Sequence, residues 1–150
     1  NTSTAKSEVI RLTNLERTSR GLKPFRFDPI LERSAQAHAE DMASGTFMSH
    51  TGSNGSSAGD RIKSAGYKAA WHDLGNGRLR YISQENVAYG YTSAKQVVTG
   101  WMNSPGHRAA ILDPITEEIG VGIKTSDVNG LNYWAQNFGI PWSAGDRSYF

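Results

Sequence analysis

Apolar residues recur at helical spacing through the first two thirds of the chain, and start and stop signals divide them into five predicted helices. These helices span residues 8–20, 29–44, 60–65, 93–102 and 107–112. The second has the strongest signals, because Asp28-Pro29 supplies an N-cap and a proline at the first helical position. Gly45 follows its last apolar residue, where glycine commonly ends a helix. Its small alanines predict close packing against another layer.

The last third of the chain changes to the two-residue period of a β-strand. Apolar residues alternate through 118–138, and the turn composition of 127–130 predicts a β-hairpin over this range. A shorter alternation at 87–91 predicts another strand. Residues 67–81 are predicted to be irregular around a turn at 75–77. Helices that precede an antiparallel pair predict a layered α+β fold.

The length of the chain predicts one domain, since 150 residues suffice for a single core. We expect a flexible segment at residues 1–7, the domain at 8–142 and a tail at 143–150. The chain begins at Asn1 without an initiator methionine, which fits removal of a signal peptide and equally fits a trimmed chain. The chain has no cysteine, which excludes disulfides, thiolate metal sites and a cysteine nucleophile.

Charge and hydropathy exclude two classes of partner. The formal net charge is +2, and the lysines and arginines are scattered rather than gathered in a stripe with aromatic residues. The sequence therefore argues against nucleic-acid binding. No apolar run approaches the roughly 20 residues that cross a bilayer, so we expect no transmembrane segment. The oligomeric state is left open.

Seven short motifs occur in a specific order along almost the whole chain. They occupy residues 14–17, 31–42, 48–52, 84–88, 101–108, 119–122 and 133–138. Together they resemble the CAP superfamily of cysteine-rich secretory proteins, antigen 5 and plant pathogenesis-related proteins. The cysteine-free motif Trp-Met-Asn-Ser-Pro-Gly-His at 101–107 is similar to the bacterial branch of that family.

The resemblance implies an α-β-α sandwich, with helices on both faces of a small antiparallel sheet. Its members share a cleft formed by two histidines and two acidic residues. By motif position, His50, Glu85 and His107 carry over as three of these. The fourth place falls at Asn103-Ser104, where this chain has no carboxylate.

The residues expected to contact a ligand are His50, Glu85, Ser104, His107 and Gln136. His50, Glu85 and His107 are also a plausible ligand set for zinc or another divalent cation, with water in the open position. A metal bound there would lower the pKa of its water towards about 7 and supply hydroxide, which makes the same three residues catalytic candidates.

Each of these residues also has a structural interpretation. His50 could be a loop residue bonded to the backbone, Glu85 could pair with an arginine, and His107 could pack at a helix end. Ser104 is interpreted as the N-cap of the helix that follows Pro105. The glycine- and serine-rich residues 50–59 are expected to form a mobile loop beside the cleft.

Three functions follow from these features. The first is a secreted or extracytoplasmic binding module for a lipid, a sterol, another envelope component or a divalent metal, and the absence of a G-x-S-x-G nucleophile motif favours it. The second is a zinc-dependent hydrolase with Glu85 as a ligand or general base. The third is a structural domain of the cell envelope or spore coat. A non-enzymatic role is favoured over an enzymatic one.

Overall fold

The computed structural model describes residues 2–69, 71–75, 78–81 and 83–142. Its helices are α1 (Thr2–Thr18), α2 (Pro29–Gly45), α3 (Ala58–Ser64), α4 (Ala94–Met102) and α5 (Pro105–Ile111). Its strands are β1 (Arg26–Phe27), β2 (Trp71–Gly75), β3 (Arg78–Tyr81), β4 (Ser83–Tyr89), β5 (Glu118–Thr125) and β6 (Asn132–Gly139). The predicted tail at 143–150 lies outside the described residues.

Four of the strands form one sheet in the order β1-β5-β6-β4. β5 and β6 pair antiparallel, which confirms the predicted hairpin, and β4 pairs antiparallel with β6. The short β1 is parallel to β5, so the sheet is mixed rather than purely antiparallel. The prediction that 67–81 is irregular is wrong, because β2 and β3 form a separate antiparallel pair there. Residues 76–77 of the predicted turn are not described.

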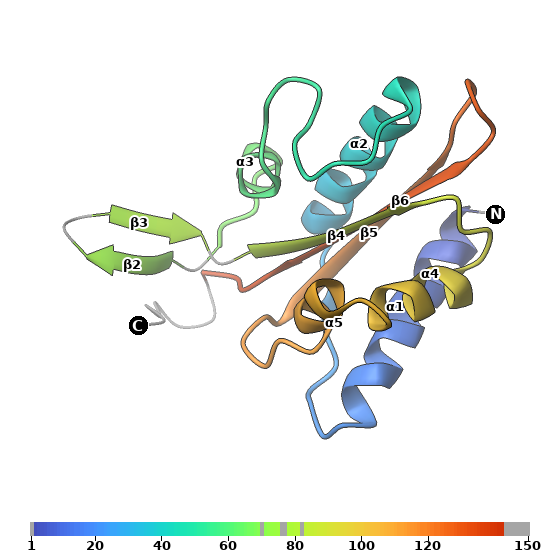
Figure 1. Ribbon diagram of the computed structural model, residues 1–150. Coiled ribbons are helices and arrows are strands. Elements are labelled where there is room, and N and C mark those ends of the chain that lie inside the picture. Colours follow the sequence, from blue (N-terminus) through green and yellow to red (C-terminus); the bar gives the residue numbers. More distant parts are fainter. Residues whose placement is uncertain (1, 70, 76–77, 82, 143–150) are drawn as a thin grey trace.

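Helices cover both faces of the sheet, as Figure 1 shows. α2 and α3 lie on one face, where Ala35 and Met42 of α2 pack against Val87 and Ala135 of the sheet. α1, α4 and α5 lie on the other face around the larger apolar cluster, which includes Trp101. The α-β-α sandwich is therefore confirmed.

Side chains of β5 alternate between the two faces of the sheet, and the face towards α2 carries only glycines over residues 120–122. Ile119 and Val121 point into the core beneath the sheet. Gly120 and Gly122 face α2, where a Cβ on Gly120 would overlap the backbone nitrogen of Glu32. Because glycine has no side chain, α2 can pack directly on the β5 backbone, which is the close approach that its alanines predicted.

The N-terminal helix begins earlier than predicted. α1 begins at Thr2, so residues 2–7, the segment expected to be flexible, are helical. Leu15 is 54% exposed, although it belongs to the apolar repeat that predicts this helix. The buried stripe is instead Val9, Thr13 and Arg17, at helical spacing of four residues. Polar side chains occupy this face because each finds a buried hydrogen-bond partner.

The motif at residues 14–17 has a structural role. Arg17 is buried and donates hydrogen bonds to the carbonyl oxygens of Lys23, Ile111 and Asp113 at 2.7 to 2.8 Å. Asn14 forms hydrogen bonds to both main-chain groups of Phe25. Its Nδ2 donates to the carbonyl oxygen at 3.1 Å, and its Oδ1 accepts the N–H at 2.7 Å. These contacts fix α1 against the connector before α2 and the end of α5.

The predicted start of α2 is confirmed. Asp28 is the N-cap, and its carboxylate accepts the N–H groups of Ile30 and Leu31 at 3.0 and 2.9 Å. The helix includes Gly45 and ends at Thr46, which adopts a left-handed conformation with φ of 50°. The residues after Thr46 lead into the loop that carries His50.

Candidate functional site

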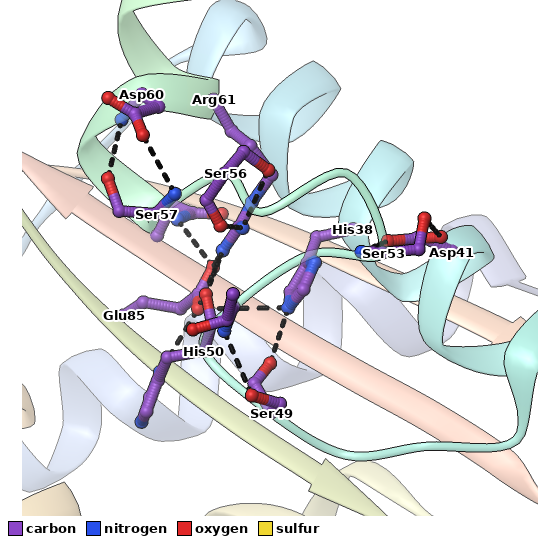
Figure 2. Close-up of polar contacts among 12 residues, drawn as sticks. His38, Asp41, Ser49, His50, Ser53, Ser56, Ser57, Asp60, Arg61 and Glu85 are labelled. Atoms are coloured by element: carbon purple, nitrogen blue, oxygen red, sulfur yellow. Dashed lines mark hydrogen bonds and ion pairs between the residues drawn. The ribbon is translucent and has the colours of Figure 1, made fainter.

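The carboxylate of Glu85 is the centre of a buried polar network on the α2 face of the sheet (Figure 2). Its side chain is 2% exposed. Arg61 of α3 binds both carboxylate oxygens through Nη2, at 3.0 and 2.8 Å. His50 Nδ1 donates to Oε1 at 3.1 Å, and Asn137 Nδ2 donates to Oε2 at 3.2 Å. Every donor comes from a different segment of the chain, so the site exists only in the folded protein.

The loop that carries His50 is tied down from both sides. His38 Nε2 of α2 lies 2.7 Å from the carbonyl oxygen of Ser49. Arg61 donates to the carbonyl oxygens of His50 and Ser56 at 3.0 and 2.8 Å. Asp41 accepts the N–H of Ser53 at 2.8 Å, and its other oxygen accepts the hydroxyl at 2.6 Å. The segment expected to be a mobile loop is therefore anchored at several points, which holds His50 in place.

Charge and burial act in opposite directions on Glu85. Burial alone would raise the pKa of its carboxyl, but the hydrogen bond from His50 and the charge of Arg61 outweigh this and lower it below 4.5. The hydrogen bond to Glu85 in turn raises the pKa of His50 above 6.5, against partial burial and the charge of Arg61. Near neutral pH the pair therefore consists of an ionised carboxylate and an imidazole that readily gains a proton.

His38 is fully buried beneath this network. A carbonyl oxygen only accepts, so Nε2 of His38 carries the proton that bonds Ser49. Burial lowers the pKa of His38, which leaves the ring neutral with an unprotonated Nδ1. That nitrogen has no hydrogen-bond partner among the described residues. His38 thus positions the loop before His50.

His107 approaches β4 from the opposite face of the sheet. Its carbonyl oxygen accepts a hydrogen bond at 3.1 Å from Asn86, the neighbour of Glu85 on β4. Asn86 also donates to Gln136 at 2.9 Å, and Gln136 donates to Thr13 at 3.3 Å. Burial, followed by the positive charge of His50, lowers the pKa of His107. The charge of His50 therefore reaches His107, although the two residues come from different segments.

Ser104 does not act as the predicted cap. The residue is at the N-cap position of α5, but its side chain makes no capping hydrogen bond. Its Oγ lies 2.9 Å from Nδ1 of His107 instead. Ser104 therefore orients His107, with Nε2 left as its second polar atom.

The structure brings together some of the predicted site residues and separates others. His50 and Glu85 are in contact, and His107 with Ser104 lies at the same strand edge. Gln136, which was expected to contact a ligand, has no exposed surface and supports Asn86 from within the core. The interpretation of Glu85 as a partner of an arginine describes the observed contact.

Sequence reasoning missed Arg61 and His38. The sequence offered an arginine as a partner of Glu85, but it gave no signal for Arg61, which lies 24 residues away. His38 lies three residues after Ala35 on the apolar stripe of α2. A polar residue in such a stripe predicts a buried hydrogen bond, although not its partner.

The family of the chain follows from sequence comparison. Residues 10–138 match the family model of CAP, the cysteine-rich secretory protein family. The chain belongs to the CAP family. Its lack of cysteine and its Bacillus subtilis relative YkwD place this CAP domain in the cysteine-free bacterial branch. YkwD is 38% identical over 133 residues, which are 87% of this chain and 45% of YkwD. The CAP domain thus spans less than half of that relative.

Solved structures share the fold of this CAP domain. An extracellular SCP-domain protein of Bacillus anthracis has a TM-score of 0.77 at 23% identity, covering 93% of this chain and 41% of that one. An outer surface protein of Borrelia burgdorferi has a TM-score of 0.74 at 22% identity, covering 89% of this chain and 90% of that one. No helix in the described part of the CAP domain is long and apolar enough to cross a membrane.

The Glu85 carboxylate of this CAP domain is committed to Arg61, which binds both of its oxygens. His50 donates Nδ1 to the same carboxylate, and its Nε2 is not engaged there. Within the described ranges, no three histidine, cysteine, aspartate or glutamate side chains form a group that could hold a metal ion. A guanidinium thus supplies the positive charge that a metal would bring to Glu85.

The three histidines of the site should titrate in a defined order. We expect His50 to gain its proton first as the pH falls from 8, above 6.5, while His38 and His107 follow below 6.5. Because the folded pKa of His50 is raised, its contribution to stability is complete below pH 6.5 and is lost as the pH rises through that pKa. NMR titration of the ring protons measures the order. Glu85→Gln should return the pKa of His50 towards 6.5, and an unchanged value would contradict the assignment.

Proposed function

We propose that this CAP domain is an extracytoplasmic binding module that holds a polar ligand of the cell envelope beside β4, between the loop of His50 and the helix of His107. The proposal rests on one observation: the carboxylate of Glu85 already has all its hydrogen-bond partners within the protein. Its carboxylate accepts hydrogen bonds from Arg61, His50 and Asn137 and is closed to solvent. The groups left for a ligand are therefore hydrogen-bonding groups rather than a base or a metal.

The exposed groups at this site are suited to binding. The side chain of His50 is 59% exposed, and Nδ1 is held by Glu85, so Nε2 is the atom that faces a ligand. Ser104 holds His107 in the same way through Nδ1. Two oriented imidazoles can each donate or accept one hydrogen bond. Hydrolysis would require a free base or an activated water, and Glu85 is not available for either role.

The extracytoplasmic location is supported by the family and by the neighbours with the same fold. The Borrelia burgdorferi protein is an outer surface protein, and the Bacillus anthracis protein is extracellular. Envelope polymers are the ligands that a protein at such a location meets at high local concentration. We therefore place the ligand in the envelope.

Binding to envelope fractions tests this function. The full chain is incubated separately with cell-wall fragments and with lipid vesicles, and bound protein is measured by sedimentation. We expect His50→Ala/His107→Ala to bind its fraction roughly 10- to 30-fold more weakly, because about two net hydrogen bonds are lost. Val128→Ala is the matched control, since Val128 is 71% exposed in the β5–β6 turn. Equal binding by the double variant, with a lower thermal stability, would favour the structural envelope domain instead.

Zinc should not bind through the two histidines. Calorimetric titration of zinc should give the same heats for the wild type and for His50→Ala/His107→Ala, because Arg61 holds the Glu85 carboxylate and two imidazoles are one ligand short of the three that a zinc site takes from the protein. A binding heat in the wild type that disappears in the double variant would overturn this expectation and restore the zinc-dependent hydrolase.

A further inference from the structure

The outer edge of β4 exposes main-chain groups at the centre of the proposed binding site. β4 is the last strand of the sheet and, among the described residues, pairs only with β6. The bond from the N–H of Gly90 to Asn132 sets the alternation, so the even-numbered residues of β4 exchange hydrogen bonds with β6. Glu85 and Val87 therefore point their N–H and C=O groups outward. The bond from Trp101 Nε1 to the carbonyl oxygen of Val87, at 3.1 Å, agrees with this.

Glu85 has an unusual distribution of exposed surface. Its side chain is 2% exposed, yet the residue as a whole is partly exposed, so its accessible surface belongs mainly to its main chain. Within the described part of the chain, no hydrogen bond is made to the N–H or the C=O of Glu85. Because Arg61 holds the side chain inward, the side chain does not cover these two main-chain groups.

At two other places in the molecule, an amide side chain forms hydrogen bonds to both the N–H and the C=O of one residue. Asn14 bonds both main-chain groups of Phe25. Gln36 does the same at Ile123 on the other side of the sheet, accepting its N–H at 3.1 Å and donating to its oxygen at 3.0 Å. In each case a carboxamide presents its N–H and its C=O on one side. The outward pair at Glu85 has the same donor and acceptor without such a partner among the described residues.

We propose that the N–H and C=O of Glu85 bind a ligand group that presents an N–H donor and a C=O acceptor on the same side. This inference rests on the proposed function and names the chemistry of its ligand. Two sources supply that group: one residue of an extended peptide, as in strand addition to a sheet edge, and a primary carboxamide. A trans secondary amide such as an N-acetyl group points its N–H and C=O in opposite directions and does not match.

The neighbours of Glu85 limit the length of the ligand segment. The indole N–H of Trp101 already binds the carbonyl oxygen of Val87, which disfavours strand addition in that direction. His50 contacts β4 through Glu85 from one face, and His107 contacts it through Asn86 from the other. A ligand bonded to Glu85 is thus limited on the Val87 side, and the segments that carry His50 and His107 lie next to it.

NMR of the full ¹⁵N-labelled chain tests the pair directly. The amide of Glu85 should exchange with solvent faster than those of Asn86 and Ala88, which bond to β6. Two probes are titrated: N-acetylalanine N′-methylamide for the peptide source and propionamide for the carboxamide source. N,N-dimethylpropionamide, which keeps the carbonyl and lacks the N–H, is the control. At least one probe should shift the Glu85 amide saturably, with the control about fivefold weaker, the value of one net hydrogen bond.

The outcomes separate the sources and the two proposals. A response to the blocked alanine alone identifies a peptide main chain, and a response to propionamide alone identifies a carboxamide. Equal affinity for all three compounds, or no shift at Glu85, overturns the inference. If envelope binding still depends on His50 and His107 in that case, the proposed function stands without it. If envelope binding is independent of both histidines while Glu85 responds to a probe, the proposed function fails and the amide site remains.

Discussion

Arg61→Met is expected to lower the free energy of unfolding by about 3–5 kcal/mol, because it leaves the Glu85 charge buried without its main partner. The Arg61 side chain is 11% exposed and that of Glu85 is 2% exposed, so solvent cannot replace the lost contact. Two carbonyl oxygens of the His50 loop also lose their donor. Urea unfolding of the variant and of the wild type at pH 7 measures the difference.

The control for this variant is a pair of the same charges at the surface. Arg11 and Glu8 are 62% and 43% exposed, so Arg11→Ala should leave the stability almost unchanged. Glu85→Gln/Arg61→Met should be less destabilised than the sum of its two single variants, since neither charge is then left alone. A loss below about 1 kcal/mol for Arg61→Met would show that Arg61 does not hold the carboxylate.

The same pair sets an acid limit to stability. The folded pKa of Glu85 is lowered, so its contribution is present above pH 4.5 and is lost as the pH falls through the folded value. In Arg61→Met, less stability should be lost on acidification, because the cation that most favours the ionised carboxylate has been removed. Unfolding measured from pH 7 down to pH 3 tests the sign.

Gly120→Ala is expected to destabilise the protein by about 3 kcal/mol or more, at the upper end of what overpacking a core causes. The new methyl group would overlap the backbone of Glu32 on α2, and a backbone cannot rotate away as a flexible side chain can. Either α2 must move off the sheet or β5 must bend. Because α2 carries His38, the loop of His50 should loosen at the same time.

Gly106→Ala is the matched control for this substitution. Nothing lies within 4 Å of a Cβ at Gly106, and alanine has the higher helix propensity in α5. Chemical denaturation should therefore show Gly106→Ala to be neutral or slightly stabilised. If the two alanine variants unfold at the same denaturant concentration, the direct contact of α2 with the β5 backbone is not the constraint described above.

Local patterns were sufficient where the signal lay within one element. The cap at Asp28 fixed the start of α2, because both groups that it satisfies are two and three residues away. Alternation in β5 and β6 predicted the hairpin, since its turn and its apolar residues are adjacent in sequence. The spacing of Leu15 did not reveal which face of α1 is buried, because that face carries Thr13 and Arg17, whose hydrogen-bond partners lie far away in sequence.

By itself, the sequence determined the start of α2, the hairpin and the family, and it singled out His50, Glu85 and His107 as candidates. The tertiary structure alone decided what that set can do. Glu85 is 24 residues from Arg61 and 35 from His50, and no local rule predicts which cation reaches a buried acid. That choice is made by the packing of α3 and its loop over β4, because a charge inside a protein is tolerated only where folding brings its partner.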